Sequence, residues 1–226
     1  MKREIPRDSP APHLDAEAVQ LITRVCFGVA DDLSRSCEAI MAFGVSDPVS
    51  QRECRKAFCM AVHTTAPSVA YIVGGSPHGT VAAPGESEAE QLLREIGPKG
   101  YPSIEFRIEK ASTNTLENVT NCLPLGLAGH ESMLLISKEP HAGRCRLTLM
   151  KYAPAMDIRS RGYPTRLKGS HAVIARDRWN ESPEHRDAIW SEFLRIKTYG
   201  ERGDIAYPDD VRSAVDRVFV LACPAH

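Results

Sequence analysis

The sequence IEFRIEKASTNTLEN at residues 104–118 contains the unit that decides the fold: a strand, a loop and the start of a helix. Apolar and polar side chains alternate over residues 104–109, which predicts a β-strand, and a helix is expected over about 114–123. Between them, residues 109–118 carry two carboxylates, two carboxamides and three hydroxyls. Such a density of hydrogen-bonding groups is typical of a site that binds a polar ligand.

The same unit occurs three more times along the chain. Strands are predicted at 38–43, 68–73 and 132–137, and each is followed by a predicted helix, at 48–63, 87–96 and 141–152. Two of these helices have start signals: Asp47 precedes Pro48, and Ser87 with Glu90 has the form of a capping box. Strand, loop and helix repeated four times predict an α/β protein with a Rossmann-like, doubly wound, mostly parallel sheet.

The ends of the chain are predicted to add helices to this core. Residues 1–37 are expected to form a tail and a helical extension (one or two helices over 14–35), 38–157 the Rossmann-like core, and 158–226 a C-terminal region packed on that core. Within this last region, the arginine-rich stretch 158–170 is interpreted as a solvated basic loop. Helices are expected at 183–197 and 208–218, and residues 218–223 are compatible with a late edge strand.

Composition narrows the class of protein. The 226-residue chain has a formal net charge of -1, which gives no electrostatic argument for binding nucleic acid or an anionic membrane. No apolar run approaches the roughly 18–20 residues that span a bilayer, and the N-terminus has no signal-like apolar region. The seven cysteines are odd in number and form no CxxC pair, which predicts reduced, largely buried thiols in a cytoplasmic protein. The sequence leaves the oligomeric state open.

Polar residues gather in the four loops that follow the predicted strands. Because parallel strands end at the same edge of a sheet, and ligands bind there, we expect these loops to surround one small-molecule site. The residues expected to bind a cofactor or ligand are Gly44, Asp47, Gly74, Gly75, Glu88, Ser112, Asn114, Thr115, Glu117, Asn118 and Arg144. The candidate catalytic residues are Glu109, His141 and His78.

Each of these residues also has a purely structural interpretation. Gly74-Gly75 matches neither the GxGxxG fingerprint nor a phosphate loop, and such a pair can simply form a tight turn. Glu109 suits a ribose hydroxyl or an amine, or it is a solvated charge. One of the three residues 112–114 is expected to cap the following helix, but capping leaves Glu117 and Asn118 unexplained. His141 and Arg144 can together bind an anion, or lie separately on the surface.

Two chemistries find little support in the sequence. No local spacing of histidine, cysteine and acidic residues predicts a metal site, so no metal is expected. No GxSxG elbow is present for a serine nucleophile.

Five motifs in order resemble those of the bacterial SanA/YdcF/ElyC-like family. They are AFG at 42–44, IVGG at 72–75, SEA at 87–89, the 109–118 pattern ExxSxNTxEN, and LIS at 135–137 followed by His141 and Arg144. The chain resembles most the YdcF-like members, which have no membrane segment. The resemblance covers about residues 38–153 and implies a Rossmann-like fold and binding of S-adenosylmethionine.

Three functional hypotheses follow. The first is an enzyme that binds S-adenosylmethionine or a nucleotide-like ligand at the strand ends. The second is a hydrolase or transferase acting on a phosphorylated or envelope-related substrate, in which His141 and Arg144 hold the anion and Glu109 or His78 is the general base. The third is a non-catalytic module that senses a ligand.

Overall fold

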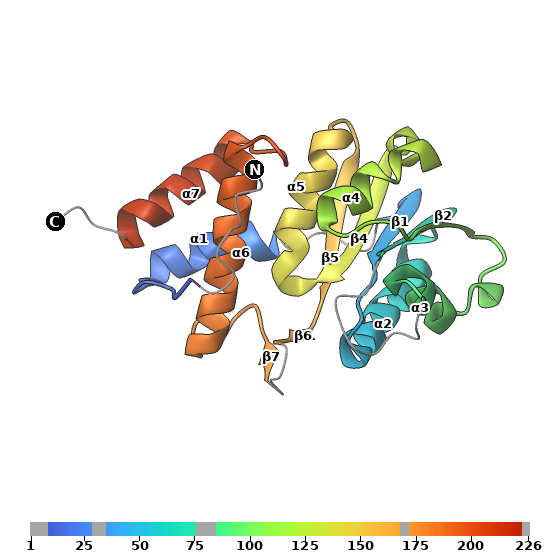
Figure 1. The fold of residues 1–226 in the computed structure, drawn as a ribbon. Helices are drawn as coiled ribbons and strands as arrows, with labels where there is room; N and C mark the ends of the chain where they lie inside the picture. Colours follow the sequence, from blue (N-terminus) through green and yellow to red (C-terminus); the bar gives the residue numbers. More distant parts are fainter. Residues whose placement is uncertain (1–8, 29–34, 76–84, 168–171, 223–226) are drawn as a thin grey trace.

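A computed structural model describes residues 9–28, 35–75, 85–167 and 172–222, and it is built on one five-stranded parallel sheet (Figure 1). The strand order is β3-β2-β1-β4-β5, and every neighbouring pair is parallel. The strands are β1 (Ala39–Phe43), β2 (Val69–Val73), β3 (Glu105–Glu109), β4 (Ser132–Lys138) and β5 (Asp157–Tyr163). The direction in which strands are added reverses between β1 and β4, which makes this pair the topological switch point.

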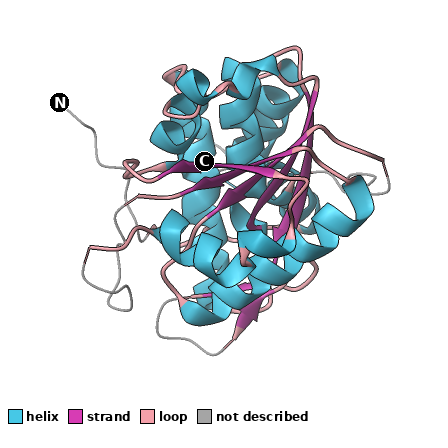
Figure 2. Cartoon of the chain, turned by 90° about the vertical axis from the view of Figure 1, so that its right-hand side faces the viewer, coloured by secondary structure: helices cyan, strands magenta, loops and turns pink. Residues whose placement is uncertain are grey.

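Helices cover both faces of the sheet (Figure 2). One face is covered by α2 (Pro48–Thr65) and α3 (Glu88–Ile96), and the other by α4 (Thr115–Thr120) and α5 (Ala142–Tyr152). Short 3-10 turns complete the connections at Pro98–Gly100, Leu123–Leu125, Leu127–Gly129 and Glu139–His141. The predicted α/β, Rossmann-like, doubly wound fold is therefore confirmed.

Side chains of each central strand enter two separate cores. In β1, Ile40 and Ala42 pack with α2 and α3, whereas Met41 and Phe43 pack with α4 and α5. All five residues of β1 and all five of β2 are buried. A parallel strand covered on both faces needs such a continuous apolar run, and this is why these two strands are recognisable in the sequence.

The predicted helix starts are confirmed at the level of individual hydrogen bonds. A carboxylate oxygen of Asp47 accepts from the Ser50 N–H at 2.7 Å, directly before Pro48. Ser87 and Glu90 form the reciprocal capping box, with N–O distances of 3.1 Å to the Ser87 hydroxyl and 2.9 Å to the Glu90 carboxylate. Each cap satisfies amide groups that the first helical turn leaves without partners.

The interpretation of residues 158–170 as a basic loop is wrong for most of this stretch. Residues 157–163 form β5, which pairs with β4, and Thr165–Arg166 (β6) pairs with Val173–Ile174 (β7) in an antiparallel ribbon. Arg159 is buried in β5, where its guanidinium donates to the backbone carbonyls of Arg35 at 2.7 Å and Ser36 at 2.5 Å. The buried charge of Arg159 is tolerated because these carbonyls accept the hydrogen bonds that water would otherwise accept.

Three helices form a layer beside α5: α1 (Ala16–Phe27), α6 (Pro183–Glu201) and α7 (Asp209–Ala222) (Figure 1). The helices expected at 183–197 and 208–218 are thus confirmed. The possible strand at 218–223 is wrong for residues 218–222, which continue α7. Val215 and Val218 are buried three residues apart, as helical spacing requires, while the intervening positions face outward.

The helical layer is attached to the core by a close backbone contact. A Cβ atom added to Gly143, at the start of α5, would lie 1.9 Å from the Val25 carbonyl oxygen of α1. Only glycine allows this approach, and α1, α5, α6 and α7 then share one apolar cluster.

Five of the cysteines lie buried as free thiols, namely Cys26, Cys37, Cys54, Cys122 and Cys145, and Cys59 is partly buried. The seventh, Cys223, lies outside the described residues. Among the helices that the structure describes, none combines the length and the apolar character needed to cross a lipid bilayer.

Candidate functional site

Loops following the first four strands lie together at one edge of the sheet, here called the carboxyl edge. The parallel register places Phe43 beside Val73 and Val73 beside Glu109, so that these strands end level with one another. In the second loop, the Gly74 N–H donates to the Glu109 carbonyl at 3.0 Å. The expected convergence of the loops is therefore present. His78, one of the candidate catalytic residues, lies outside the described residues.

The three glycines at this edge allow the loops to pack on each other. A Cβ atom on Gly75 would lie 1.9 Å from the Ser112 carbonyl oxygen, and one on Gly44 would lie 2.8 Å from the carbonyl of Glu88. Gly74 has a φ of 145° and lies against the Glu88 side chain. These positions thus join the first, second and third loops, and their lack of a side chain serves contacts within the protein.

Glu109, at the end of β3, is buried and shapes the third loop. Its Oε1 atom accepts from the N–H groups of Ala111 at 2.7 Å and Ser112 at 2.9 Å, and from Asn121 Nδ2 at 3.0 Å. Its other oxygen, Oε2, is buried and has no hydrogen-bond partner among the described residues. One oxygen therefore fixes the backbone, while the second remains available to a further donor.

The polar residues that follow Glu109 bond mainly to one another. Asn114 caps α4 by accepting from the Glu117 N–H at 3.0 Å, and Glu117 accepts from the Thr113 N–H at 2.7 Å. The Ser112 hydroxyl donates to Asn118 Oδ1. The inference that capping leaves Glu117 and Asn118 unexplained is corrected, because both close the loop at the start of α4.

A buried ion pair joins this loop to the helical layer. The Arg144 guanidinium bonds to Glu192 of α6 and also donates to the Thr115 hydroxyl at 2.5 Å. Glu192 is 1% exposed and accepts from Arg195 at 3.2 Å as well. Burial raises the pKa of Glu192, but the attraction of Arg144 outweighs it and lowers that pKa to about 2.

Sequence reasoning missed Glu192, although a signal for it exists. The residue lies between Ile189 and Phe193 and one turn before Ile196, on the buried face of α6. A carboxylate on an apolar helix face needs a buried partner, which here is Arg144. Because Arg144 is committed to Glu192 and Thr115, its charge is already compensated within the protein.

His141 lies beside this ion pair, with its Nε2 atom 3.9 Å from Glu192 Oε2. Its side chain is 38% accessible yet stands among cationic groups. Partial burial, together with the neighbouring Arg144 and Lys138, lowers the pKa of His141 to about 4 against the pull of Glu192. The imidazole is therefore neutral near pH 7 and can accept a proton, but it cannot bind an anion as a cation would.

Lys138 is the last residue of β4, at the switch point of the sheet. Burial lowers the pKa of this lysine, and the nearby carboxylates of Glu88 and Asp47 oppose that shift. Within the described part of the chain, the Lys138 ammonium group takes part in no hydrogen bond or ion pair, whereas Asp47 is engaged as the α2 cap and Arg144 with Glu192. Sequence reasoning placed Lys138 in the fourth loop but did not select it.

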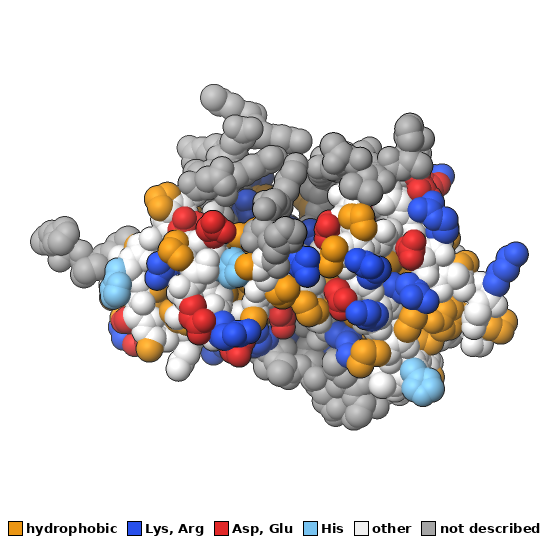
Figure 3. Space-filling model, turned by 90° about the horizontal axis from the view of Figure 1, so that it is seen from below, with side chains coloured by type: hydrophobic (Ala, Val, Ile, Leu, Met, Phe, Trp, Pro, Cys, Tyr) orange, Lys and Arg blue, Asp and Glu red, His pale blue; other side chains and the backbone are white. Residues whose placement is uncertain are grey.

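A cavity of about 500 Å³ opens next to Lys138 and His141, and is here called the α6 cavity. Its walls come from α6, from the β6–β7 ribbon and from the end of β4. Seen from below Figure 1, the side on which this ribbon lies, basic and acidic side chains alternate with apolar ones (Figure 3). Of the predicted site residues that the structure describes, only His141 lines the cavity.

Neither a metal site nor a known relative identifies the ligand of this protein. Among residues 9–28, 35–75, 85–167 and 172–222, no three histidine, cysteine or acidic side chains are placed to hold a metal ion. Neither the known protein-family models nor the curated proteins include a match to this chain.

Proposed function

We propose that this chain binds a small ligand with an anionic group, S-adenosylmethionine or a nucleotide-like molecule, at the carboxyl edge between β1 and β4. The observation that carries this proposal is Lys138, a partly buried ammonium group without a hydrogen-bonding partner in the described chain, at the end of β4. Burial disfavours this cation, and an anionic group bound to it would add to the stabilisation that Glu88 and Asp47 provide. Ligands of open α/β sheets bind at the switch point, where Lys138 lies.

Features of the third loop support the choice of ligand class. The free Oε2 atom of Glu109 suits a ribose hydroxyl or an amino group, both of which S-adenosylmethionine carries. The carboxylate of that molecule, or the phosphate of a nucleotide, suits Lys138. The resemblance to the SanA/YdcF/ElyC-like family favours S-adenosylmethionine. A cytoplasmic location, where such ligands are abundant, fits this proposal.

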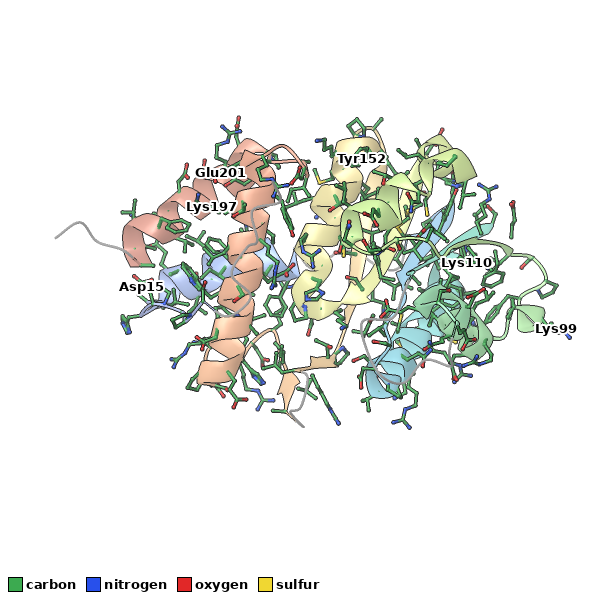
Figure 4. All side chains as sticks on the ribbon, viewed as in Figure 1. Asp15, Lys99, Lys110, Tyr152, Lys197 and Glu201 are labelled. Atoms are coloured by element: carbon green, nitrogen blue, oxygen red, sulfur yellow. The ribbon has the colours of Figure 1, made fainter. Side chains whose placement is uncertain are left out.

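Isothermal titration of the full chain with S-adenosylmethionine, S-adenosylhomocysteine, ATP and AMP tests the proposal. We expect at least one of them to bind, and Lys138→Met to weaken that binding about tenfold or more, because a charge-assisted bond contributes about 1.5–3 kcal/mol. Lys99→Met is the matched control, since Lys99 is exposed and precedes β3, away from the carboxyl edge (Figure 4). The absence of binding by all four ligands, or an unchanged affinity in Lys138→Met, would contradict the proposal.

A second candidate function is hydrolysis or group transfer with His141 as general base. Its motivation is the neutral imidazole, which lines the α6 cavity and lies near Glu192. A panel of phosphate-ester and carboxylate-ester substrates tests this function on the wild type and on His141→Gln. Activity retained by the variant excludes His141 as the base. Recovery of a bound ligand chemically unchanged after long incubation supports the third possibility, a sensing module.

A further inference from the structure

The α6 cavity has a polar group in its wall that the folded chain does not use. Ser191 is 2% exposed, its hydroxyl oxygen has no hydrogen-bond partner among the described residues, and the residue lines the cavity. An unsatisfied buried hydroxyl costs free energy, and a polar atom of a bound molecule would remove that cost.

The remaining walls combine apolar surface with charged side chains of both signs. Pro140, Leu167, Ile174 and Ile189 line one part of the cavity. Among the described residues, its charged side chains are three cations and three carboxylates: Lys138, Arg166 and Arg195, with Glu184, Asp187 and Glu192.

Contacts within the protein engage some of these charged groups and not others. Asp187 accepts from the Ala11 N–H at 2.8 Å, and Glu192 is bonded to Arg144 and Arg195. Within the described chain, the groups left without such a bond are Lys138, Arg166 and Glu184. Glu184 lies in the first turn of α6, where the helix dipole favours a negative charge.

From this arrangement we infer that the α6 cavity binds a second ligand, a small organic anion with a short apolar body. The apolar walls hold the body, Arg166 attracts the carboxylate or phosphate, and the Ser191 hydroxyl bonds to one of its oxygens. A cavity of about 500 Å³ is within the range of small-molecule pockets. This inference extends the proposed function. It rests on that function in one respect, namely that the molecule in the α6 cavity is the partner of the ligand at the carboxyl edge.

Butyrate, hexanoate, butyl phosphate and hexylamine are suitable probes, added to the full chain and followed by ligand-observed NMR. Hexanoate should bind more tightly than butyrate by about threefold to fourfold for each added CH₂ group, since each buried methylene adds a similar increment to the free energy of binding. Binding of butyl phosphate shows whether the cavity accepts a phosphate as well as a carboxylate. Hexylamine should bind at least about tenfold more weakly than hexanoate because its charge has the opposite sign.

Two variants locate the binding. Ala188→Phe projects into the cavity from the half-buried face of α6 and should lower hexanoate affinity about tenfold or more by filling the space. Ser191→Ala should lower it by about threefold to tenfold through the loss of one hydrogen bond. Ala128→Phe, an exposed position in the turn before β4, is the control and should leave affinity unchanged.

Results of this experiment and of the nucleotide titration are separable. If hexanoate binds as expected but no nucleotide or S-adenosylmethionine does, the cavity assignment stands and the proposed function fails. If no probe binds at millimolar concentration, if hexylamine binds as well as hexanoate, or if Ser191→Ala and Ala188→Phe both keep the wild-type affinity, the cavity assignment is overturned.

Discussion

His141 and Glu192 lie 3.9 Å apart, and the protein holds the first neutral and the second charged. Burial is the main reason why the imidazole stays neutral, and Arg144 both stabilises the carboxylate and repels a second cation on the imidazole. Pairs of titratable groups whose environments shift their pKa values are typical of functional sites, although structural ion pairs produce the same effect. Two measurements on single residues examine this arrangement.

The neutral His141 predicts a loss of stability as the pH falls from 6.5 to about 4. In this window the unfolded chain binds a proton that the folded protein does not, so acidification favours unfolding. The contribution of Glu192 is lost in a lower window, from 4.5 to about 2, because its carboxylate must be protonated there. Melting temperature measured against pH should flatten between 6.5 and 4 in His141→Gln. An unchanged slope in that variant would show that other groups carry the effect.

Glu192→Gln leaves the Arg144 charge buried without its carboxylate. Removing one partner of a buried pair typically costs about 3–5 kcal/mol, and we expect a loss of that size in the free energy of unfolding measured with urea. Glu201→Gln is the matched control on the same helix, because Glu201 forms an exposed pair with Lys197 (Figure 4). Exposed pairs contribute up to about 1 kcal/mol. Equal losses in both variants would rule out a special role for Glu192.

At the scale of elements, the sequence predicted those strands and helices whose signal is local. β1 and β2 are continuous apolar runs, and Asp47 and Ser87 mark helix starts through bonds to residues three positions away. β5 escaped prediction because Arg159 and Arg161 interrupt its apolar pattern. The carbonyls that accommodate Arg159 belong to residues more than 120 positions earlier, which no local pattern reveals.

The candidate site likewise has features that the sequence predicts and features that depend on tertiary contacts. Parallel pairing alone brings the four loops to one edge, so their convergence was predictable from the order of the elements. The Arg144–Glu192 pair and the α6 cavity were not, since they depend on how α6 packs against α5 and β4. Which residues remain available to a ligand also depends on such contacts: Arg144 is engaged, whereas Lys138 is not.

The buried arginine of β5 can be tested against its neighbour in the strand. Arg159→Leu should lower the free energy of unfolding by about 1–3 kcal/mol, because two backbone carbonyls near the start of β1 lose their donor. Arg161→Leu, at a half-buried position whose guanidinium contacts Met60, should change it by about 0.5 kcal/mol or less. Urea denaturation followed by circular dichroism compares the two. A larger effect of Arg161→Leu would mean that Arg159 does not anchor β5.

At the scale of the whole molecule, the helical layer and the sheet are linked through α5. The apolar cluster of α1, α6 and α7 includes Leu147 of α5, and Gly143 of α5 lies against the backbone of α1. The other side of α5 contributes Cys145 and Leu149 to the core beneath α4. The Arg144–Glu192 pair adds a polar link between the two parts. Because α5 is buried on both faces, we expect the helical layer to unfold together with the sheet.

This linkage predicts a single unfolding transition. Both tryptophans, Trp179 and Trp190, are buried in the helical layer, so their fluorescence follows that layer, whereas far-ultraviolet circular dichroism follows the helices of the whole molecule. In urea the two signals should have the same midpoint, as they do in a two-state protein. In Glu192→Gln the fluorescence midpoint should fall at least as far as the dichroism midpoint, because the polar link is lost. A fluorescence transition that precedes the other in the wild type would show that the layer unfolds independently, and that α5 joins two units rather than one.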